Sequence, residues 1–207
     1  LENVRLVGLH CHIGSQIFAV QSFQHATSIM MDFIAEIKKS SGYEIVELDM
    51  GGGFGIYYYP GDEPPAAEDW ANAVMLTVES KAKELGLTTP MVIVEPGRSI
   101  AGPAGVTLYT AGSVKEVKGI RKYLAVDGGM GDNPRPALYG SKYTAIIANR
   151  ANENPVEKIS IAGKCCESGD MLIWDADLPI VAAGDIIAVF ATGAYNYTMS
   201  SNYNRLP

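Results

Sequence analysis

The sequence has no long uninterrupted apolar run and few cysteines. Its most apolar region, residues 178–194, is interrupted by Asp185, whereas roughly 20 consecutive apolar residues are needed to cross a bilayer. Only 3 cysteines occur in 207 residues, and Cys165 and Cys166 are adjacent, which is a poor basis for a disulfide framework and typical of a reducing compartment. We therefore expect a cytoplasmic protein with no membrane contact.

Clusters of positive charge and several common catalytic motifs are also missing. The 16 Lys and Arg residues are outnumbered by 23 Asp and Glu residues, so clustered cations that would bind nucleic acid are not expected. The chain has no GxSxG elbow, GxxxxGK[ST] phosphate loop or HExxH motif. The run His10–His12 lacks the ligand spacing of a closed zinc site, so we expect no metal centre.

What is present is the pattern of an ordinary globular protein, with 47% apolar and 19% charged residues. In the first hundred residues, short apolar runs predict strands at Arg5–Leu9, Ile45–Met50 and Met91–Val94, and helical periodicity predicts helices at Ser22–Ser41 and Asp69–Leu85. We expect the first helix to be closed by Gly42 and the second by Gly86, and this alternation to form a parallel sheet. The buried face of the first helix is expected to contain Phe23, Ala26, Ile29, Met30, Phe33, Ile34 and Ile37.

The residue pattern of the sequence changes after a domain boundary that we place near Ala101–Gly105. From there on, helical periods largely vanish and short strand-like runs are separated by Gly, Asn and Pro. We therefore predict an antiparallel β domain in the second half. Its expected strands are Val106–Val117, Tyr123–Val126, Tyr143–Asn149, Val156–Ala162, Met171–Trp174 and Ile186–Thr192.

Three motifs follow the three strands of the first half. They are HIGSQ at His12–Gln16, GGGFG at Gly51–Gly55 and EPGRS at Glu95–Ser99. The carboxyl ends of parallel strands lie at the same edge of a sheet, so we expect these motifs to converge. Consecutive glycines let backbone N–H groups approach a phosphate closely, although such a turn can also be purely structural.

The side chains of these motifs suit a ring with a phosphate. His10 and His12 share one face of an extended chain, and small donors follow His12, although a histidine beside a strand can also be a core residue. Glu95 could face a cationic ring nitrogen while Arg98 binds a carboxylate in bidentate fashion. Alternatively, Glu95 and Arg98 form a simple salt bridge.

Three further motifs lie in the second half: RPALY after the turn DGGMGD, CESGD, and GAY. Arg135 and Tyr139 could clamp a carboxylate, or Arg135 could only cap a loop. Cys166 could donate a proton if it is partly exposed, or be an inert buried thiol. Tyr195 could donate its hydroxyl to a phosphate, or fill the edge of the core.

Taken in order, these six motifs resemble the fold-type III, alanine-racemase-like decarboxylases that depend on pyridoxal 5'-phosphate, and within them the diaminopimelate decarboxylases. The resemblance covers essentially the whole chain, and six motifs in the family's order are specific. It implies an α/β plus β fold, in which residues 1–102 are the C-terminal part of a (β/α)8 TIM-like barrel and residues 103–207 an incomplete C-terminal antiparallel β domain. It also implies a homodimer with shared active sites.

The resemblance assigns a role to each candidate residue. Residues implied to hold the cofactor are His12, which stacks on the ring, Glu95, which faces the pyridine nitrogen, and, around the phosphate, Ser15, Gly52, Gly53, Gly55, Gly97 and Tyr195. Residues implied to bind the amino-acid substrate are Arg98, Arg135, Tyr139 and Glu167. Cys166 would come from the other subunit and protonate the α-carbon, so the catalytic set is His12, Glu95 and Cys166.

The implied reaction is decarboxylation of meso-2,6-diaminopimelate to L-lysine and CO2, the last step of lysine biosynthesis. A carboxylate beside the pyridine nitrogen keeps it protonated, so that the ring accepts the electrons freed by bond cleavage. The combination of RPALY and CESGD favours this substrate over ornithine, arginine or carboxynorspermidine. A non-catalytic decarboxylase-like regulator and a phosphate-binding barrel without this chemistry are two further interpretations of the same motifs.

The family's Schiff-base lysine lies on an early barrel strand, and no lysine here occupies its motif. We therefore expect the 207-residue segment alone to be inactive. With most barrel strands missing, its uncovered sheet edges and helix faces would also favour aggregation.

Overall fold

The computed structural model describes residues 3–206, which fold into two compact units. An α/β unit runs to Ile56 and resumes over Glu63–Ser99. A β unit comprises the short segment Tyr57–Asp62 together with the chain from Ile100 onward. Among the described residues, no helix combines the length and the apolar character that a membrane span requires.

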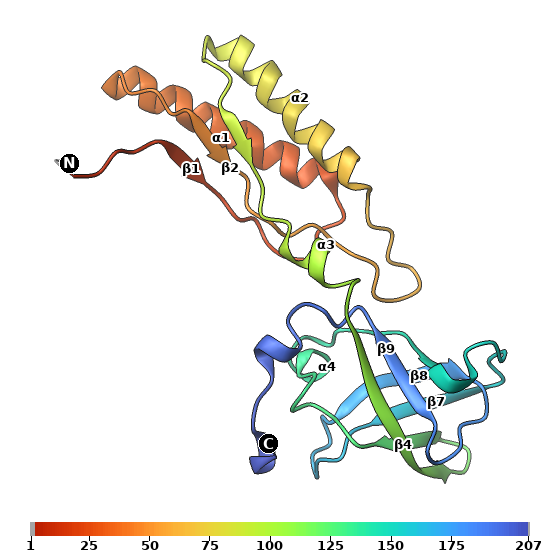
Figure 1. Ribbon diagram of the computed structural model, residues 1–207. Coiled ribbons are helices and arrows are strands. Elements are labelled where there is room, and N and C mark those ends of the chain that lie inside the picture. Colours follow the sequence, from red (N-terminus) through yellow and green to blue (C-terminus); the bar gives the residue numbers. More distant parts are fainter. Residues whose placement is uncertain (1–2, 207) are drawn as a thin grey trace. The chain divides into compact units, whose positions relative to one another are not determined.

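The α/β unit contains a three-stranded parallel sheet in the order β1-β2-β3, with two long helices that lie side by side (Figure 1). The predicted alternation of strands and helices is confirmed, although the strands are shorter than expected. A one-turn helix, α3, was not predicted. The elements are β1 (Gly8–His10), α1 (Val20–Ser41), β2 (Glu47–Asp49), α2 (Ala67–Leu85), β3 (Met91–Ile93) and α3 (Gly97–Ala101).

Both long helices end at the glycines that the sequence indicated. Gly42 has φ +71° and Gly86 has φ +64°, which is the left-handed region that glycine enters without steric cost. The Gly42 amide donates to the Lys38 carbonyl, and the Gly86 amide donates to the Ala82 carbonyl. Each glycine therefore satisfies a carbonyl that the helix end would otherwise leave unpaired.

The buried face of α1 differs from the predicted one. Phe23, Thr27, Met31 and Ile34 are buried, whereas Ile29 and Phe33 are 53% and 47% exposed. The prediction is confirmed for Phe23 and Ile34, and Ala26, Met30 and Ile37 pack partly buried against the core. It was wrong for Ile29 and Phe33, and it missed Thr27 because it followed apolar residues only. The Thr27 hydroxyl donates to the Phe23 carbonyl at 2.8 Å, so it is satisfied inside the helix and can be buried.

An aromatic cluster lies at the centre of this core. The Phe23 ring stacks on Phe54 at 5.2 Å between centroids, and Trp70 meets both rings edge-on at 4.5 and 5.4 Å. Leu48 of β2 and the following Met50 are fully buried beneath the helices. Offset and edge-to-face contacts of this kind add to the stabilisation from apolar burial.

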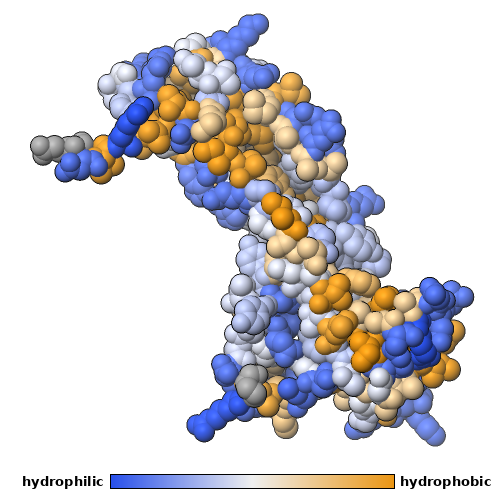
Figure 2. All heavy atoms as spheres, viewed as in Figure 1, coloured by the Kyte–Doolittle hydropathy of each residue, from blue (hydrophilic) through white to orange (hydrophobic). Residues whose placement is uncertain are grey.

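One surface of the α/β unit remains apolar. A groove of about 420 Å³ lies between α2 and the strand β3 with its following loop, and Figure 2 shows apolar side chains exposed over this unit. Residues that line it include Phe54, Trp70, Val74, Met75, Val92 and Val94.

The β unit is a six-stranded sheet in the order β6-β9-β4-β5-β7-β8. The prediction of a purely antiparallel domain was wrong, because β5 and β7 pair in parallel, with Leu124 opposite Ile161. Local alternation predicts that a segment is a strand but does not say in which direction its neighbour runs. The strands are β4 (Val106–Val117), β5 (Arg121–Val126), β6 (Ala145–Ile147), β7 (Glu157–Ala162), β8 (Met171–Leu178) and β9 (Ile186–Phe190).

Short helical turns interrupt this sheet where the sequence predicted loops or strand. The helix α4 (Arg135–Tyr139) begins with a proline in its first turn and ends at Gly140, which has φ +61°. Five residues are too few to show helical periodicity, so the sequence pattern could not reveal it. A 3-10 turn at Ala148–Arg150 replaces the end of the predicted strand Tyr143–Asn149.

A partly buried ion pair holds the turn before β9. Asp185 is 6% exposed, and one of its carboxylate oxygens lies 2.6 Å from Arg150 Nη2. Hydrogen bonds from Arg150, from the Ala182 amide and from the Asn149 side chain lower the pKa of Asp185 to about 2. The ionised carboxylate is therefore the form that the folded state favours.

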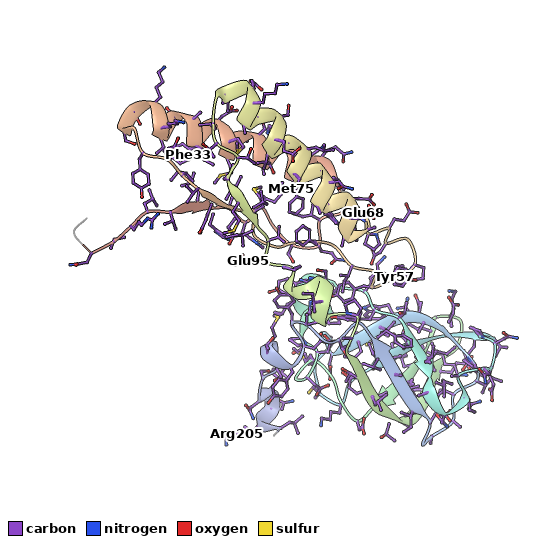
Figure 3. The ribbon with its side chains drawn as sticks, turned by 45° about the horizontal axis from the view of Figure 1, so that its top comes forward. Phe33, Tyr57, Glu68, Met75, Glu95 and Arg205 are labelled. Atoms are coloured by element: carbon purple, nitrogen blue, oxygen red, sulfur yellow. The ribbon has the colours of Figure 1, made fainter. Side chains whose placement is uncertain are left out.

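The aromatic cluster generates a stability prediction with a matched control on the same helix. Phe23→Ala should lower the free energy of unfolding by about 3–5 kcal/mol, because it empties a fully buried site. Phe33→Ala removes a half-exposed ring (Figure 3) and should change it by no more than about 1 kcal/mol. Denaturant unfolding monitored by tryptophan fluorescence measures both. Equal losses would contradict the observed burial of α1.

The ion pair generates a pH prediction. The folded-state pKa of Asp185 lies below its unfolded value of about 3.9, so its contribution is present above pH 4 and disappears as the pH falls toward 2. Asp185→Asn should therefore lower the thermal midpoint at pH 7, and the difference from the wild type should shrink between pH 4 and pH 2. Asp177→Asn, which breaks an exposed pair with Lys158, is the control with little effect at either pH. A difference that is constant with pH would refute this role.

Candidate active site

Three loops meet at the carboxyl ends of β1, β2 and β3. Backbone hydrogen bonds between the strands continue into these loops. The Cys11 amide donates to the Asp49 carbonyl at 2.9 Å, and the Glu95 amide donates to the Gly51 carbonyl at 2.8 Å. The structure therefore brings HIGSQ, GGGFG and EPGRS together, and Glu95 lies just beyond β3 (Figure 3).

The glycines of the middle loop are needed because other backbone segments occupy the space of a side chain. A Cβ on Gly51 would lie 2.5 Å from the Cys11 carbonyl oxygen, one on Gly52 2.3 Å from that of Glu95, and one on Gly53 2.2 Å from that of Gly14. All three distances are shorter than any real Cβ contact. We refer to Gly51–Gly53 as the glycine turn.

His12 is anchored to this turn. The Gly52 amide donates to His12 Nδ1 at 3.3 Å, which makes Nδ1 an acceptor and leaves the proton of a neutral imidazole on Nε2. The Gly55 amide is also engaged within the protein, because it donates to the Ile17 carbonyl at 3.1 Å. Gly52 and Gly55 therefore shape the loop and orient His12.

Glu95 is accompanied by His10, to which sequence analysis gave no role, and by Asp49, which it did not select. Its Oε2 lies 3.2 Å from His10 Nε2, and donor atoms of His10, Asp49 and Glu95 all lie within 4.8 Å of one another. Asp49 is fixed in turn, because its Oδ1 accepts the Gly51 amide at 2.8 Å. The pairing of β1 with β2 explains why these residues meet, because it places His10 opposite Asp49. Imidazole and carboxylate groups this close together are also the ligand types of a divalent metal site.

A second group of polar atoms lies beside the glycine turn. Arg98 Nη2 donates to Ser15 Oγ at 2.8 Å, which leaves the Ser15 hydroxyl proton free to point elsewhere. Within residues 3–206, the backbone hydrogen bonds between loops do not use the amides of Gly14, Ser15 or Gly53. Unpaired amides with a hydroxyl and a guanidinium are the donors that suit a phosphate. The residues present therefore fit a phosphorylated ligand.

Gly97 has a different setting. No heavy atom lies within 4 Å of the position of its Cβ, so it faces open space. Its amide donates to the Glu95 carbonyl at 2.8 Å. Gly97 thus leaves room beside Glu95 without offering its own N–H group.

In the β unit, Arg135 is a buried cation. It is 6% exposed, its Nη1 donates to the Tyr143 hydroxyl at 2.5 Å, and its guanidinium carbon lies 4.8 Å from the centroid of the Tyr58 ring. No carboxylate pairs with it anywhere in residues 3–206. Tyr139, at the other end of α4, is 67% exposed. The two residues of RPALY therefore lie in opposite environments.

The CESGD loop carries an exposed thiol and an acid. Cys166 is exposed, and the carboxylate of Glu167 accepts hydrogen bonds from the Gly169 amide and the Tyr203 hydroxyl, which lower its pKa. Asp170, 2% exposed, ties this loop to the turn DGGM, because it accepts the Met130 amide at 2.6 Å and the Cys165 amide at 2.7 Å. Sequence analysis quoted Asp170 within its motif but gave it no role.

The candidates therefore divide between the units. The α/β unit holds one converging set, and the β unit holds the others; Tyr195 of GAY is 45% exposed with φ +63°. The first set consists of His12, Ser15, Gly52, Gly53, Gly55, Glu95, Gly97 and Arg98. The second consists of Arg135, Tyr139, Cys166, Glu167 and Tyr195.

Comparison with known proteins places this site in a family. Residues 1–102 match the model described as "Pyridoxal-dependent decarboxylase, pyridoxal binding domain". Residues 1–102 therefore belong to the pyridoxal-dependent decarboxylases, and the structural neighbours of the whole chain are decarboxylases of the TIM-barrel fold. Within that family, the chain is similar over its whole length to proteins named diaminopimelate decarboxylase.

Particular relatives support this position. The Bacillus subtilis diaminopimelate decarboxylase is 52% identical over 206 residues, which are 100% of this chain and 47% of the relative. The crystal structure of the M. jannaschii diaminopimelate decarboxylase in complex with L-lysine has a TM-score of 0.88 at 40% identity, over 96% of this chain and 44% of that one. A Vibrio vulnificus lysine/ornithine decarboxylase, 21% identical with a TM-score of 0.82 over 98% of this chain and 53% of its own, shares the fold. The chain spans about half the length of the relatives it matches.

The glycine turn generates a prediction that separates steric clash from backbone strain. Gly51 and Gly86 have nearly the same φ, +66° and +64°, but a Cβ meets the Cys11 backbone only at Gly51 and nothing at Gly86. Gly86→Ala should cost about 1–2 kcal/mol of unfolding free energy for its left-handed conformation. Gly51→Ala should cost a further 1–3 kcal/mol or so, because the two loops must separate.

Thermal and denaturant unfolding of both variants in the complete protein measure this difference. Equal destabilisation would show that the loops are not held in contact at the glycine turn.

Proposed function

We propose that the protein to which this chain belongs decarboxylates meso-2,6-diaminopimelate to L-lysine and CO2 with pyridoxal 5'-phosphate. The observation that carries the proposal is the position of Glu95, whose carboxylate lies at the carboxyl ends of the strands, next to the glycine turn and the free amides of Gly14, Ser15 and Gly53. This is the arrangement that a phosphorylated pyridine ring requires. The relatives named diaminopimelate decarboxylase, one of them crystallised with L-lysine, suggest the substrate.

The fold proposal follows from the same relatives. We assign residues 1–102 to the C-terminal part of a (β/α)8 barrel and residues 103–207 to the C-terminal β domain. The apolar groove beside α2 and β3 and the unpaired edges of the sheet are what the rest of such a barrel would cover. We further propose a homodimer whose two subunits share their active sites.

Each residue around the proposed cofactor has a physical task. When bound, pyridoxal phosphate supplies a protonated pyridine ring that accepts the electron pair released on loss of CO2. The Glu95 carboxylate holds the proton at the ring nitrogen. His12, oriented by the Gly52 amide, presents its ring face for stacking. Ser15, Gly53 and Tyr195 donate to the phosphate, Gly52 and Gly55 shape the loop beside it, and Gly97 leaves room for it.

The substrate end is assigned to the β unit and Arg98. The guanidinium of Arg135 is buried and has no carboxylate partner among residues 3–206, so it suits the distal carboxylate of meso-diaminopimelate. Ornithine and arginine lack this carboxylate. Glu167, whose pKa is lowered, is ionised at neutral pH and suits the distal ammonium group. Tyr139 and Arg98 complete the set.

The proton that replaces CO2 is assigned to Cys166. Its thiol is exposed and not engaged in a disulfide, and we propose that it reaches the active site of the partner subunit and protonates the α-carbon. A thiol with this task must stay reduced, which agrees with the cytoplasmic location expected from the sequence.

The test is an assay of the complete protein loaded with pyridoxal phosphate. We expect L-lysine and CO2 from meso-diaminopimelate, with much slower turnover of ornithine, arginine and carboxynorspermidine. Glu95→Gln should lower kcat by about 100-fold or more, because an amide cannot hold the ring proton as a carboxylate does. Glu68→Gln, an exposed change in the first turn of α2 (Figure 3), is the control with unchanged kcat.

Two outcomes would overturn the proposal. If the wild type forms no L-lysine from meso-diaminopimelate, the function is wrong. If it does so and Glu95→Gln retains the wild-type kcat, the role of Glu95 is wrong.

A further inference from the structure

Arg135 is buried in a way that ordinary structural arginines are not. Arg135 is only 6% exposed, yet no carboxylate in residues 3–206 forms an ion pair with it. An uncompensated charge in such a place is strongly unfavourable unless other groups stabilise it. The groups that stabilise the buried charge of Arg135 must therefore be found among its neighbours in the protein.

Two tyrosines enclose its guanidinium. Tyr143, 1% exposed, accepts a hydrogen bond from Arg135 Nη1 at 2.5 Å, and its ring centroid lies 5.7 Å from the guanidinium carbon. Tyr58, 6% exposed, presents its ring at 4.8 Å. The two rings meet edge to face, with centroids 5.3 Å apart and planes inclined by 83°. We refer to Tyr58 and Tyr143 as the tyrosine pair.

Both members of the tyrosine pair are held by their local backbone. Tyr58 lies in a tight turn in which one oxygen of Asp62 accepts the amides of Tyr58 and Tyr59 at 2.9 and 3.1 Å. Tyr143 follows α4 after the left-handed Gly140, which closes the helix and reverses the chain. The pair is thus buried, and the backbone beside each ring is ordered by local hydrogen bonds.

The chemistry of this support matters as much as its geometry. Aromatic faces and a phenol oxygen stabilise a guanidinium without cancelling its charge, whereas a carboxylate in the same place would neutralise it. Burial raises the pKa of Tyr143, so its hydroxyl stays neutral at physiological pH. The full positive charge of Arg135 remains available to an anionic ligand.

We propose that Tyr143, together with Tyr58, is a positioning residue for Arg135 and thereby sets the preference for a substrate with a distal carboxylate. The hydroxyl of Tyr143 takes part of the guanidinium fork and leaves the remaining N–H groups for that carboxylate. This inference rests on the proposed function, in which Arg135 binds the distal end of meso-diaminopimelate.

The experiment uses the complete, cofactor-loaded protein with the variant Tyr143→Phe, which keeps the ring and removes the hydroxyl. We expect KM for meso-diaminopimelate to rise about ten-fold while kcat stays within about two-fold, because a hydrogen bond to a charged group is lost away from the reacting atoms. Tyr58→Leu, which removes the ring face, should raise KM in the same direction. Tyr57→Phe, a half-exposed neighbour, is the matched control with unchanged KM.

Competitive inhibition separates positioning from a general structural effect. L-lysine retains the distal carboxylate of the substrate, whereas cadaverine (1,5-diaminopentane) has none. Tyr143→Phe should weaken inhibition by L-lysine about ten-fold and leave inhibition by cadaverine within about two-fold.

The outcomes are distinguishable. No wild-type turnover of meso-diaminopimelate would refute the proposed function itself. Wild-type turnover with unchanged KM and L-lysine inhibition in Tyr143→Phe would overturn this inference alone. Equal weakening of L-lysine and cadaverine would also overturn it, because it would show that the hydroxyl only maintains the fold.

Discussion

The close approach of three backbone loops at the glycine turn is the constraint on which the α/β site depends. Gly51, Gly52 and Gly53 each face a carbonyl oxygen of a neighbouring loop at a distance that no Cβ could tolerate. The same contact fixes Asp49 through the Gly51 amide and His12 through the Gly52 amide. The glycines therefore act chiefly by letting the loops meet, and the order of the polar side chains around them is a consequence.

The two units use charge in contrasting ways. Glu95 is an exposed carboxylate at the end of a strand, oriented by His10, and its unused oxygen can face a ligand. Arg135 is a buried cation whose charge is preserved by neutral aromatic neighbours. Among residues 3–206, Glu95 has only a histidine as its ion-pair partner, and Arg135 has no carboxylate partner. Both charges are therefore available to a charged cofactor or to a charged amino acid.

Sequence reasoning succeeded where a signal is local and failed where it is not. The order of strands and helices in the α/β unit and the ends of α1 and α2 at Gly42 and Gly86 could be predicted from periodicity and from the conformational freedom of glycine. The buried face of α1 was predicted only in part, because Thr27 satisfies its hydroxyl internally and is buried, while Ile29 and Phe33 are exposed. The parallel pairing of β5 with β7 and the contact between Tyr58 and Arg135 join distant segments that carry no shared local pattern. The site motifs were selected from residue types and their position after strands, and the family resemblance supplied their roles. The contact of His10 and Asp49 with Glu95 emerged only from the structure.

The central claim is that these loops surround one pyridoxal phosphate ring with the carboxylate of Glu95 at its nitrogen. A crystal structure of the complete protein with the cofactor and L-lysine tests it most directly. The account predicts a distance of roughly 2.7–3.2 Å between a Glu95 oxygen and the ring nitrogen, with the phosphate beside Ser15 and Gly53. A ring bound elsewhere, or a Glu95 carboxylate turned away from the nitrogen toward solvent, would contradict it.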